Sequence, residues 1–296
     1  MKALVTGAAG FIGTHLVKAL RAQGHDVECV DPRLTRQSVD DDPARNYPGS
    51  VQEYLCAHYH AGLNGLTHIF HLGGYAGVQQ SWPHQKFGGY TENNIVATHR
   101  LLEACMRQTP VPRVVYASSS SVIGNGDGPI SPYGVSKKAG EDLMRVYALR
   151  GVHAVSLRYF TVYGPGQRPD MAFRKWIDAA LTDQPLTIYG NGRQTRSFTF
   201  VDDVIDATIR AATADVPSGA VFDVGGPEPH SLLDALGILS NLTIQPNLRL
   251  DFQPAQPGDP RSVIPNLDLA REHLGYWPTT HLERGLEQQV TWQKGL

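Results

Sequence analysis

The chain has 296 residues, of which 41% are hydrophobic and 18% charged, and its formal net charge is −2. This apolar content is sufficient for a large core, and the near-neutral charge excludes a general basic field that would hold nucleic acid or an anionic membrane. Cys29, Cys56 and Cys105 are too few and too widely spaced for a disulfide framework or a metal cluster. With no signal-peptide pattern and no apolar run of membrane-spanning length, we expect a cytoplasmic protein.

The first thirty residues have the pattern of one βαβ unit. A buried strand is expected at 2–6, a helix at 11–23 and a second strand at 27–30. Further strands are expected at 67–70, 113–116, 153–157 and 220–224, with helices at 94–108, 133–149 and 201–213. Strands that alternate with helices predict an α/β protein with a Rossmann-type, doubly wound parallel sheet.

The pattern loosens after residue 160 into segments punctuated by proline and glycine. Such segments are typical of loops, and we expect them to belong to a smaller, mixed α/β substrate domain. The expected helix and strand within 201–224 return to the first domain. The sequence therefore predicts a dinucleotide-binding domain of 1–160 with a return segment near 201–224, and a second domain of 161–200 and 225–296.

A glycine-rich turn follows the first expected strand, with the sequence Thr6-Gly7-Ala8-Ala9-Gly10-Phe11-Ile12-Gly13. Backbone N–H groups and the positive end of the following helix can meet a pyrophosphate there. Asp31 ends the second strand, where its carboxylate can accept hydrogen bonds from both adenosine ribose hydroxyls and would repel a 2′-phosphate. The pattern predicts NAD, although Arg33 and Arg36 leave NADP open. A tight turn with an N-capping Asp is the structural alternative.

Tyr133 and Lys137 lie four residues apart, and hence on one face of the expected helix. A nearby ammonium and a positive nicotinamide ring both stabilise a phenolate, which makes Tyr133 a candidate general base. An aromatic ring packed under an aliphatic lysine stem is the alternative for this spacing. The strand at 113–116 delivers four serines, 118–121, to its carboxyl end, where ligands bind in such sheets. A serine hydroxyl there can relay a substrate proton.

With these segments together, the chain resembles the extended short-chain dehydrogenase/reductase family, in particular its nucleoside-diphosphate-sugar epimerases and dehydratases. The resemblance runs nearly end to end. It is carried by the glycine turn, His71-Leu72-Gly73-Gly74, Asn94 in Asn-Asn-Ile-Val-Ala-Thr, the serine run, Tyr133 with Lys137, and Leu157-Arg158-Tyr159-Phe160.

The resemblance implies a role for each matching residue. The catalytic triad falls on Ser119, Tyr133 and Lys137. NAD would be held by Gly7, Gly10, Phe11, Ile12, Gly13, Asp31, Leu72, Gly73, Gly74, Asn94, Tyr133, Lys137 and Tyr159. The nucleotide sugar would be held by Ser119, Ser120, Thr161, Arg168, Arg196 and Arg261. The family also implies a homodimer, in which the helices at 94–108 and 133–149 pair across the interface.

The type of reaction depends on the residues after the catalytic hydroxyl. Family members that dehydrate sugars carry Asp and Glu there, and uronate decarboxylases carry a Glu, whereas this chain has Ser120 and Ser121. Epimerisation needs only the hydride cycle: Tyr133 takes the 4-hydroxyl proton, hydride passes to NAD, and the 4-keto sugar rotates and is reduced on its other face. We therefore expect a nucleotide-sugar 4-epimerase, with a dehydratase, a decarboxylase or a non-enzymatic NAD-sensing module as alternatives.

The segment from Arg158 to Ala172 resembles that of UDP-glucuronate 4-epimerases, because UDP-glucose enzymes usually have Asn where Thr161 stands. Arg168 could form a fork with the sugar carboxylate, and an exposed ion pair or a diphosphate contact is its alternative. UDP-glucose and UDP-N-acetylglucosamine remain alternative substrates. Arg196 and Arg261 match diphosphate or ribose contacts. We expect no metal: the pair Asp202-Asp203 is better explained by an N-cap, because no third ligand is evident.

Overall fold

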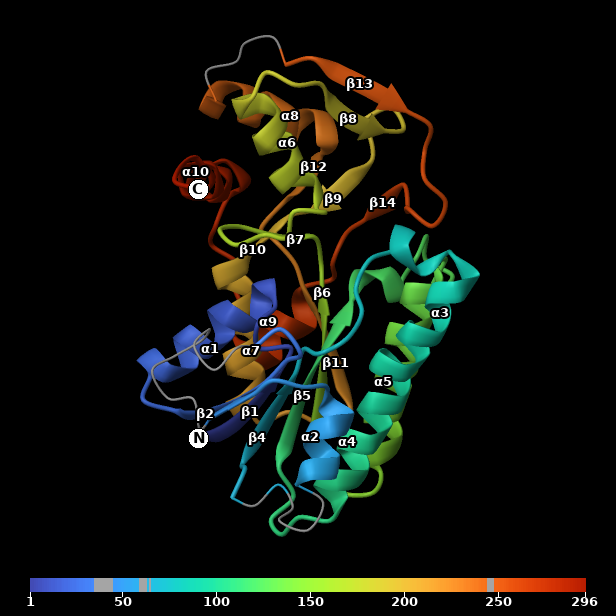
Figure 1. The fold of residues 1–296 in the computed structure, drawn as a ribbon, viewed down its shortest axis with the longest axis vertical. Coiled ribbons are helices and arrows are strands. Elements are labelled where there is room, and N and C mark those ends of the chain that lie inside the picture. Colours follow the sequence, from blue (N-terminus) through green and yellow to red (C-terminus); the bar gives the residue numbers. More distant parts are fainter. Residues whose placement is uncertain (35–44, 59–62, 64, 244–247) are drawn as a thin grey trace.

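The computed structural model describes residues 1–34, 45–58, 63, 65–243 and 248–296 (Figure 1). Its centre is a seven-stranded parallel sheet in the order β11-β6-β5-β4-β1-β2-β3. The strands are β1 (Lys2–Thr6), β2 (Asp26–Val30), β3 (Asn46–Tyr47), β4 (His68–His71), β5 (Arg113–Ser119), β6 (Ala154–Tyr159) and β11 (Ala220–Val224). The expected Rossmann-type, doubly wound sheet is confirmed.

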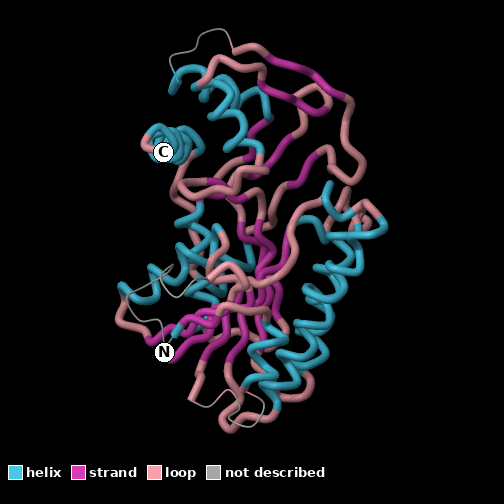
Figure 2. Tube along the Cα trace, viewed as in Figure 1, coloured by secondary structure: helices cyan, strands magenta, loops and turns pink. Residues whose placement is uncertain are grey.

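Helices cover both faces of this sheet, which is why its strands are buried on both sides (Figures 1 and 2). One face carries α1 (Phe11–Ala22), α7 (Val201–Thr213) and α9 (Asp268–Leu274). The other carries α2 (Val51–Ala57), α4 (Ala97–Met106) and α5 (Pro132–Ala148). On this side α3 (His84–Tyr90) and a π-helical turn (Thr91–Val96) precede α4.

A second lobe lies above the carboxyl ends of the strands in Figure 1. It contains α6 (Ala172–Leu181), α8 (Leu232–Thr243) and α10 (Leu282–Lys294) with four short strand pairings. The paired strands are β7 (Val162–Tyr163) with β10 (Thr199–Phe200), β8 (Leu186–Tyr189) with β13 (Leu250–Gln253), and β9 (Thr195–Ser197) with β12 (Pro229–Ser231) and β14 (Ser262–Val263). Helix α9 packs instead against β11 of the main sheet, and the domain boundaries themselves stay a prediction.

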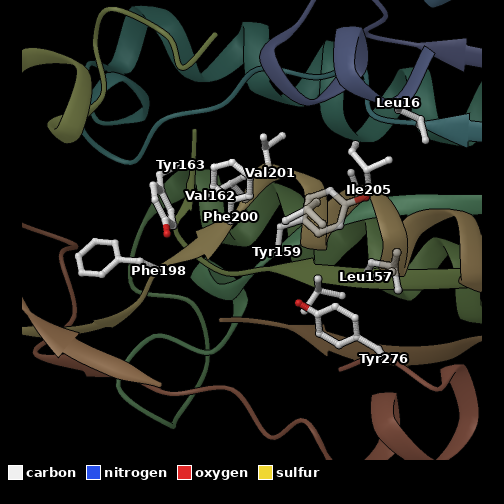
Figure 3. Packing of buried hydrophobic residues seen from close by; sticks show 14 of the residues in the cluster. Leu16, Leu157, Tyr159, Val162, Tyr163, Phe198, Phe200, Val201, Ile205 and Tyr276 are labelled. Atoms are coloured by element: carbon white, nitrogen blue, oxygen red, sulfur yellow. The ribbon is translucent and has the colours of Figure 1, made fainter. Parts of the chain in front are cut away.

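One hydrophobic cluster runs from the main sheet into the upper lobe (Figure 3). Leu157 and Tyr159 belong to the sheet, whereas Phe198 lies between β9 and β10 and Phe200 ends β10 above the sheet, and all four are buried. Tyr163 packs against both phenylalanines, with its ring centroid 6.5 Å from that of Phe198 and 5.6 Å from that of Phe200. The two lobes are therefore joined by continuous packing, which fixes the upper loops relative to the sheet edge.

The structure differs from the sequence-based elements at several boundaries. The strand expected at 113–116 continues to Ser119, because its last residues are buried and pair with β6 as far as Tyr159. The N-cap prediction for the Asp202-Asp203 pair is wrong, since Phe200 occupies that position without a side-chain bond. Asp203 instead accepts hydrogen bonds from the backbone N–H groups of Thr279 and Thr280.

In the part of the chain that the structure describes, no helix is both long and apolar enough to cross a membrane. No group of three or more His, Cys, Asp or Glu side chains there could hold a metal ion.

Candidate active site

A cleft of about 1270 Å³ opens between the carboxyl ends of the strands and the upper lobe. Its floor comes from the turn after β1, the ends of β4, β5 and β6, and the start of α5. Its far wall includes Tyr189, Gln256 and Asp259 of the upper lobe. Ligands of doubly wound sheets bind at this edge, and the cleft has room for two ligands side by side.

The glycine turn forms one end of the cleft, through Gly7, Gly10, Phe11, Ile12 and Gly13. Gly7 has φ of 72°, and a Cβ there would lie 2.8 Å from the backbone nitrogen of Gly73. Helix α1 starts after Gly10 with no side-chain cap and no acidic residue in its first turn. Its free N–H groups thus fit the pyrophosphate of a dinucleotide.

Asp31 lies at the end of β2, where a ribose would meet it, but Arg33 already binds it. Oδ1 accepts hydrogen bonds from the backbone N and Nε of Arg33, both at 2.9 Å. Oδ2 accepts from Nη2 of Arg33 at 2.8 Å and from the backbone N of Ala9 at 3.2 Å. Ribose hydroxyls must therefore replace the Arg33 guanidinium, whose side chain is 60% exposed and can move away. Arg36 lies outside the described residues.

Leu72, Gly73 and Gly74 continue the floor of the cleft. A Cβ at Gly74 would lie 2.7 Å from Oδ1 of Asn94, so this position requires glycine. Asn94 itself is 1% exposed and does not line the cleft. Its amide nitrogen donates to the Tyr75 carbonyl (2.9 Å) and to Ser136 Oγ (2.8 Å), and its Oδ1 accepts from Tyr75 N (2.7 Å). Asn94 therefore supports the cleft wall from behind.

Tyr133 and Lys137 face the cleft from the first turns of α5. Ser131 caps this helix through Oγ, which accepts from the Gly134 N–H at 3.1 Å. Burial raises the pKa of the Tyr133 phenol, whereas a hydrogen bond with Ser119 and the nearby charge of Arg168 lower it. Burial lowers the pKa of the Lys137 ammonium to about 8. Lys137 Nζ donates to the Ala117 carbonyl at 2.8 Å. The two groups that lower the pKa of the Tyr133 phenol are Ser119 and Arg168.

The serine run closes the end of β5 beside Tyr133. Ser119 Oγ accepts from the Ser121 N–H at 3.2 Å. Ser120, Thr161 and Tyr159 also line the cleft. The hydroxyl groups of Ser119, Ser120 and Thr161 therefore face the same cleft as the Tyr133 phenol, where a sugar hydroxyl could reach them. The Tyr159 hydroxyl instead bonds to Thr208 at 2.7 Å.

Arg168 projects into the cleft from the loop after β7, and its charge affects the pKa of Tyr133. Its Nε and Nη2 bind both carboxylate oxygens of Asp170, each at 2.9 Å. Asp170 also lines the cleft. The guanidinium thus holds a carboxylate in the forked geometry expected for a sugar acid, but that carboxylate belongs to the chain itself. This ion pair is the alternative that the sequence analysis gave for Arg168, although Asp170 was not named there as the partner.

The structure does not bring Arg196 and Arg261 into the cleft lining. Arg196 is paired with Asp259, which does line the cleft, and its Nη1 donates to the Thr195 carbonyl at 2.8 Å. Arg261 is exposed and accepts the Thr195 N–H through its backbone oxygen at 3.1 Å. Sequence reasoning also missed several aromatic and amide side chains of the lining, because no motif marks them: Tyr75, Gln79, Gln80, Tyr90, Tyr189 and Gln256.

Comparison with known proteins agrees with this geometry. Residues 3–225 match the model of the NAD dependent epimerase/dehydratase family. The chain belongs to this family. The matched residues include the glycine turn, the serine run and α5, which line the cleft described above. The protein is therefore an enzyme of the NAD dependent epimerase/dehydratase family, and this cleft is its candidate active site.

Individual members of the epimerase/dehydratase family match the chain over its full length. The Bacillus subtilis (strain 168) protein named "Uncharacterized UDP-glucose epimerase YtcB" is 36% identical, over 100% of this chain and 99% of that protein. The crystal structure of UDP-glucuronic acid 4-epimerase from Bacillus cereus with UDP-glucuronic acid and NAD is 36% identical, with a TM-score of 0.90 over 100% and 99% of the two chains. MoeE5, solved with UDP-glucuronic acid or UDP-glucose and NAD, is 39% identical, with a TM-score of 0.89 and the same coverage.

Proposed function

We propose that the protein is an NAD-dependent UDP-glucuronate 4-epimerase, which interconverts UDP-glucuronate and UDP-galacturonate through a 4-keto sugar. The observation that carries this proposal is the position of the Tyr133 phenol. The phenol is buried, lines the cleft, and lies close enough to Ser119 and Arg168 for both to lower its pKa. A general base, a hydroxyl relay and a carboxylate ligand therefore face one space.

The cofactor end of the cleft fits NAD. Gly7, Gly10 and the uncapped start of α1 would hold the pyrophosphate, and Asp31 would bind the ribose. Gly73 and Gly74, which have no side chains, would let the backbone lie close to the cofactor. NAD, when bound, would supply the acceptor and the donor of the C4 hydride, and its positive ring would add to the charges that favour the Tyr133 phenolate. Lys137 would turn one of its N–H groups to the nicotinamide ribose while it keeps its bond to Ala117.

The proton of the sugar 4-hydroxyl would pass to Tyr133, with Ser119 bridging. Burial raises the pKa of the phenol even with the opposing effects of Ser119 and Arg168, so the base would also need the positive nicotinamide ring to ionise near neutral pH. When the 4-keto sugar has turned its other face, Tyr133 returns the proton to the C4 oxygen. The enzyme then regains its starting state.

The charges in the cleft favour epimerisation over elimination or decarboxylation. Ser120 and Ser121 are neutral where those reactions use carboxylates. Among the described lining residues the carboxylates are Asp31, Asp170 and Asp259, and each is paired with an arginine. Each carboxylate is held by its arginine partner, so none of the three is free to remove a carbon-bound proton.

Arg168 and Thr161 would bind the sugar carboxylate, with Asp170 released from the fork when the uronate arrives. The Arg168–Asp170 pair also supports a second candidate function, a UDP-glucose 4-epimerase. While Arg168 Nε and Nη2 bind Asp170, they are not available for the carboxylate of a uronate. A neutral hexose would fit the same space. The two candidates share the hydride cycle and differ only in this exchange of carboxylates.

We also infer that the protein is a homodimer joined through α4 and α5. Val135, Val146 and Leu149 of the α5 region are 47%, 45% and 81% exposed, which supports a buried role in an assembly. Light scattering with a twofold monomer mass is the expected result. A monomer at micromolar concentration would contradict the assembly and leave the active-site proposal unchanged.

Proton NMR of the purified protein with UDP-glucuronate tests the proposal, with the anomeric signals followed without added cofactor and then again with UDP-glucose. Formation of UDP-galacturonate is the expected result. Turnover of UDP-glucose alone would select the second candidate. No turnover of either sugar, with NAD bound, would contradict both.

A further inference from the structure

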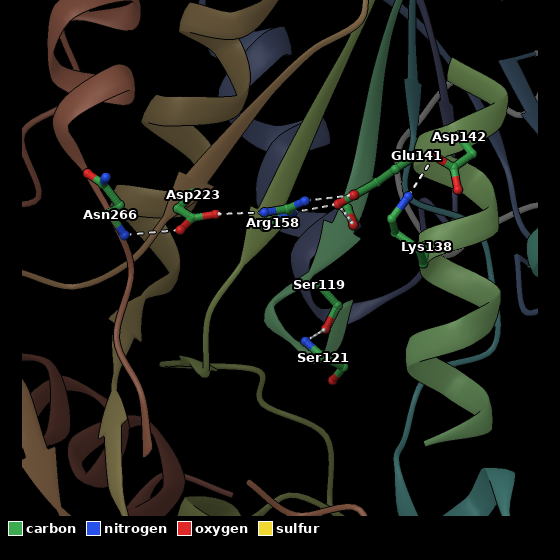
Figure 4. Close-up of polar contacts among 9 residues, drawn as sticks. Ser119, Ser121, Lys138, Glu141, Asp142, Arg158, Asp223 and Asn266 are labelled. Atoms are coloured by element: carbon green, nitrogen blue, oxygen red, sulfur yellow. Dashed lines mark hydrogen bonds and ion pairs between the residues drawn. The ribbon is translucent and has the colours of Figure 1, made fainter. Parts of the chain in front are cut away.

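On the face of α5 that carries Tyr133 and Lys137 begins a largely buried chain of charges that the proposed mechanism does not use (Figure 4). Glu141 of α5 is 4% exposed, and it binds Arg158 of β6 through two hydrogen bonds of 2.8 and 3.0 Å. Arg158 Nη1 lies 3.8 Å from Oδ1 of Asp223 on β11, and Asp223 Oδ2 accepts the backbone N–H of Asn266 at 3.0 Å. Removal of these charges from water is costly, so stability alone is a poor reason for their presence.

The chain of charges meets α5 where the catalytic residues lie. Tyr133, Lys137 and Glu141 follow one another at intervals of four, and all three are buried on one face of the helix. Each contacts one of the last three residues of β5. Tyr133 bonds to Ser119, Lys137 Nζ donates to the Ala117 carbonyl at 2.8 Å, and Ser118 Oγ donates to Glu141 Oε1 at 2.6 Å.

The same groups are in register across three strands. Ser118 pairs with Arg158, and Arg158 pairs with Asp223, so the polar line crosses β5, β6 and β11 at one level. Beyond Asp223 it ends at Asn266, three residues after β14, whose Val263 pairs with Arg196 of β9. The line therefore connects the helix that carries Tyr133 with the segment that follows the upper-lobe strands.

We propose that Glu141, held by Arg158 and Ser118, is a positioning residue that sets the height of α5 against β5 and so places the Tyr133 phenol beside Ser119. A helix that slid by a fraction of a turn would keep its hydrophobic contacts but move the phenol away from the sugar hydroxyl. Misplacement of a catalytic group by about 1 Å can lower kcat by about a hundredfold. The inference rests on the proposed epimerase function for its readout.

The test compares Glu141→Gln with Asp142→Asn in the full-length protein. Asp142 lies next to Glu141 on the outer side of α5 and is paired with Lys138 at 2.6 Å (Figure 4). Asp142→Asn therefore removes one negative charge, as Glu141→Gln does, but from an exposed ion pair. We expect Glu141→Gln to lower kcat by about ten- to a hundredfold, with KM changed less than about threefold and bound NAD unchanged. Asp142→Asn should keep the wild-type kcat.

Ser118→Ala and Arg158→Lys complete the set. Ser118→Ala removes a single hydrogen bond to Glu141, and it should lower kcat several-fold with little change in Tm, which decides the case if Glu141→Gln does not fold. Arg158→Lys keeps the charge without the fork, and its kcat should lie between those of the wild type and Arg158→Met.

Wild-type turnover in the same assay, with whichever UDP-sugar is converted, separates the two proposals. An inactive wild type would contradict the epimerase function. An active wild type would contradict the positioning role if Glu141→Gln matched Asp142→Asn in kcat, or if its kcat, KM and NAD content deteriorated together. Ser118→Ala with an unchanged kcat would also overturn it.

Discussion

The two ends of the cleft are built in different ways. At the sheet edge, backbone turns and fully buried side chains fix the polar groups: Gly7, Asn94 and Lys137 each have one geometry imposed by their neighbours. On the upper-lobe side, the charges lie on loops and on the short strand β9 and are paired with one another, as in Arg168 with Asp170 and Arg196 with Asp259. The chemistry is therefore carried by rigid elements, and the choice of sugar by groups that can exchange partners.

Tyr133→Phe gives the largest expected effect, because it removes the general base of the proposed mechanism. Turnover should fall by about a thousandfold or more, since general acid–base groups contribute about 10²–10⁴. The ring stays, so bound NAD should remain at the wild-type level, as measured by extraction and absorbance. Turnover close to that of the wild type would contradict the role of Tyr133.

Arg168→Met and Asp170→Asn act on the exchangeable side with opposite signs. Loss of the guanidinium should raise KM for UDP-glucuronate about tenfold or more and leave KM for UDP-glucose nearly unchanged. It should also lower kcat for both sugars, because the Arg168 charge lowers the pKa of Tyr133. Asp170→Asn frees the fork and should lower KM for the uronate several-fold. Steady-state kinetics with both sugars measures this. Equal changes in KM for the acidic and the neutral sugar would show that Arg168 contacts a part that both substrates share.

On the sheet side, the buried His71 should make the free energy of unfolding depend on pH. It is fully buried between Thr6 and Thr98, whose hydroxyls lie 2.8 and 2.9 Å from its ring nitrogens, and burial lowers its pKa to about 3. A histidine held neutral contributes stability above its usual pKa of about 6.5, and loses it as pH falls toward the folded-state value. The free energy of unfolding should drop by about 2 kcal/mol between pH 7 and pH 5 from this group alone.

Urea unfolding at the two pH values measures this loss. His71→Gln, which has no charge to gain, should show a smaller drop than the wild type. The same pH dependence in both proteins would assign the effect to other groups.

Arg33→Ala gives the smallest expected effect, at the border between the two sides. Without the guanidinium, the Asp31 carboxylate is free for the ribose hydroxyls and repels a 2′-phosphate. In protein stripped of cofactor, calorimetric titration should show weaker NADP binding by about fivefold to tenfold, with NAD binding unchanged or tighter. An equal loss for both cofactors would make Arg33 a general phosphate contact.

The sequence predicted the rigid side much better than the exchangeable side. Spacing alone places Gly7 before a helix and Tyr133 beside Lys137, because strand ends and helical turns have fixed geometry. Arg33 with Asp31, and Arg168 with Asp170, could not be foreseen as pairs, since two charges in a loop can bind each other or a ligand with similar energy.

Long-range contacts were the other part that the sequence could not supply. Glu141 lies one turn beyond Lys137 in an unremarkable helix, and its partners Arg158 and Asp223 come from strands that only the folded sheet places side by side. The position of Asp203 against Thr279 and Thr280 is of the same kind, and this is why the N-cap expectation failed.

The central claim is that hydride leaves C4 of the sugar and returns to C4, whereas Tyr133 takes up and returns only the proton of the 4-hydroxyl. The most direct test supplies UDP-glucuronate with deuterium at C4 to the purified protein in ordinary water without added cofactor. The account predicts UDP-galacturonate that keeps deuterium at C4, by NMR and mass spectrometry. Product with solvent hydrogen at C4 would contradict the hydride cycle, because it would require removal of the carbon-bound hydrogen as a proton.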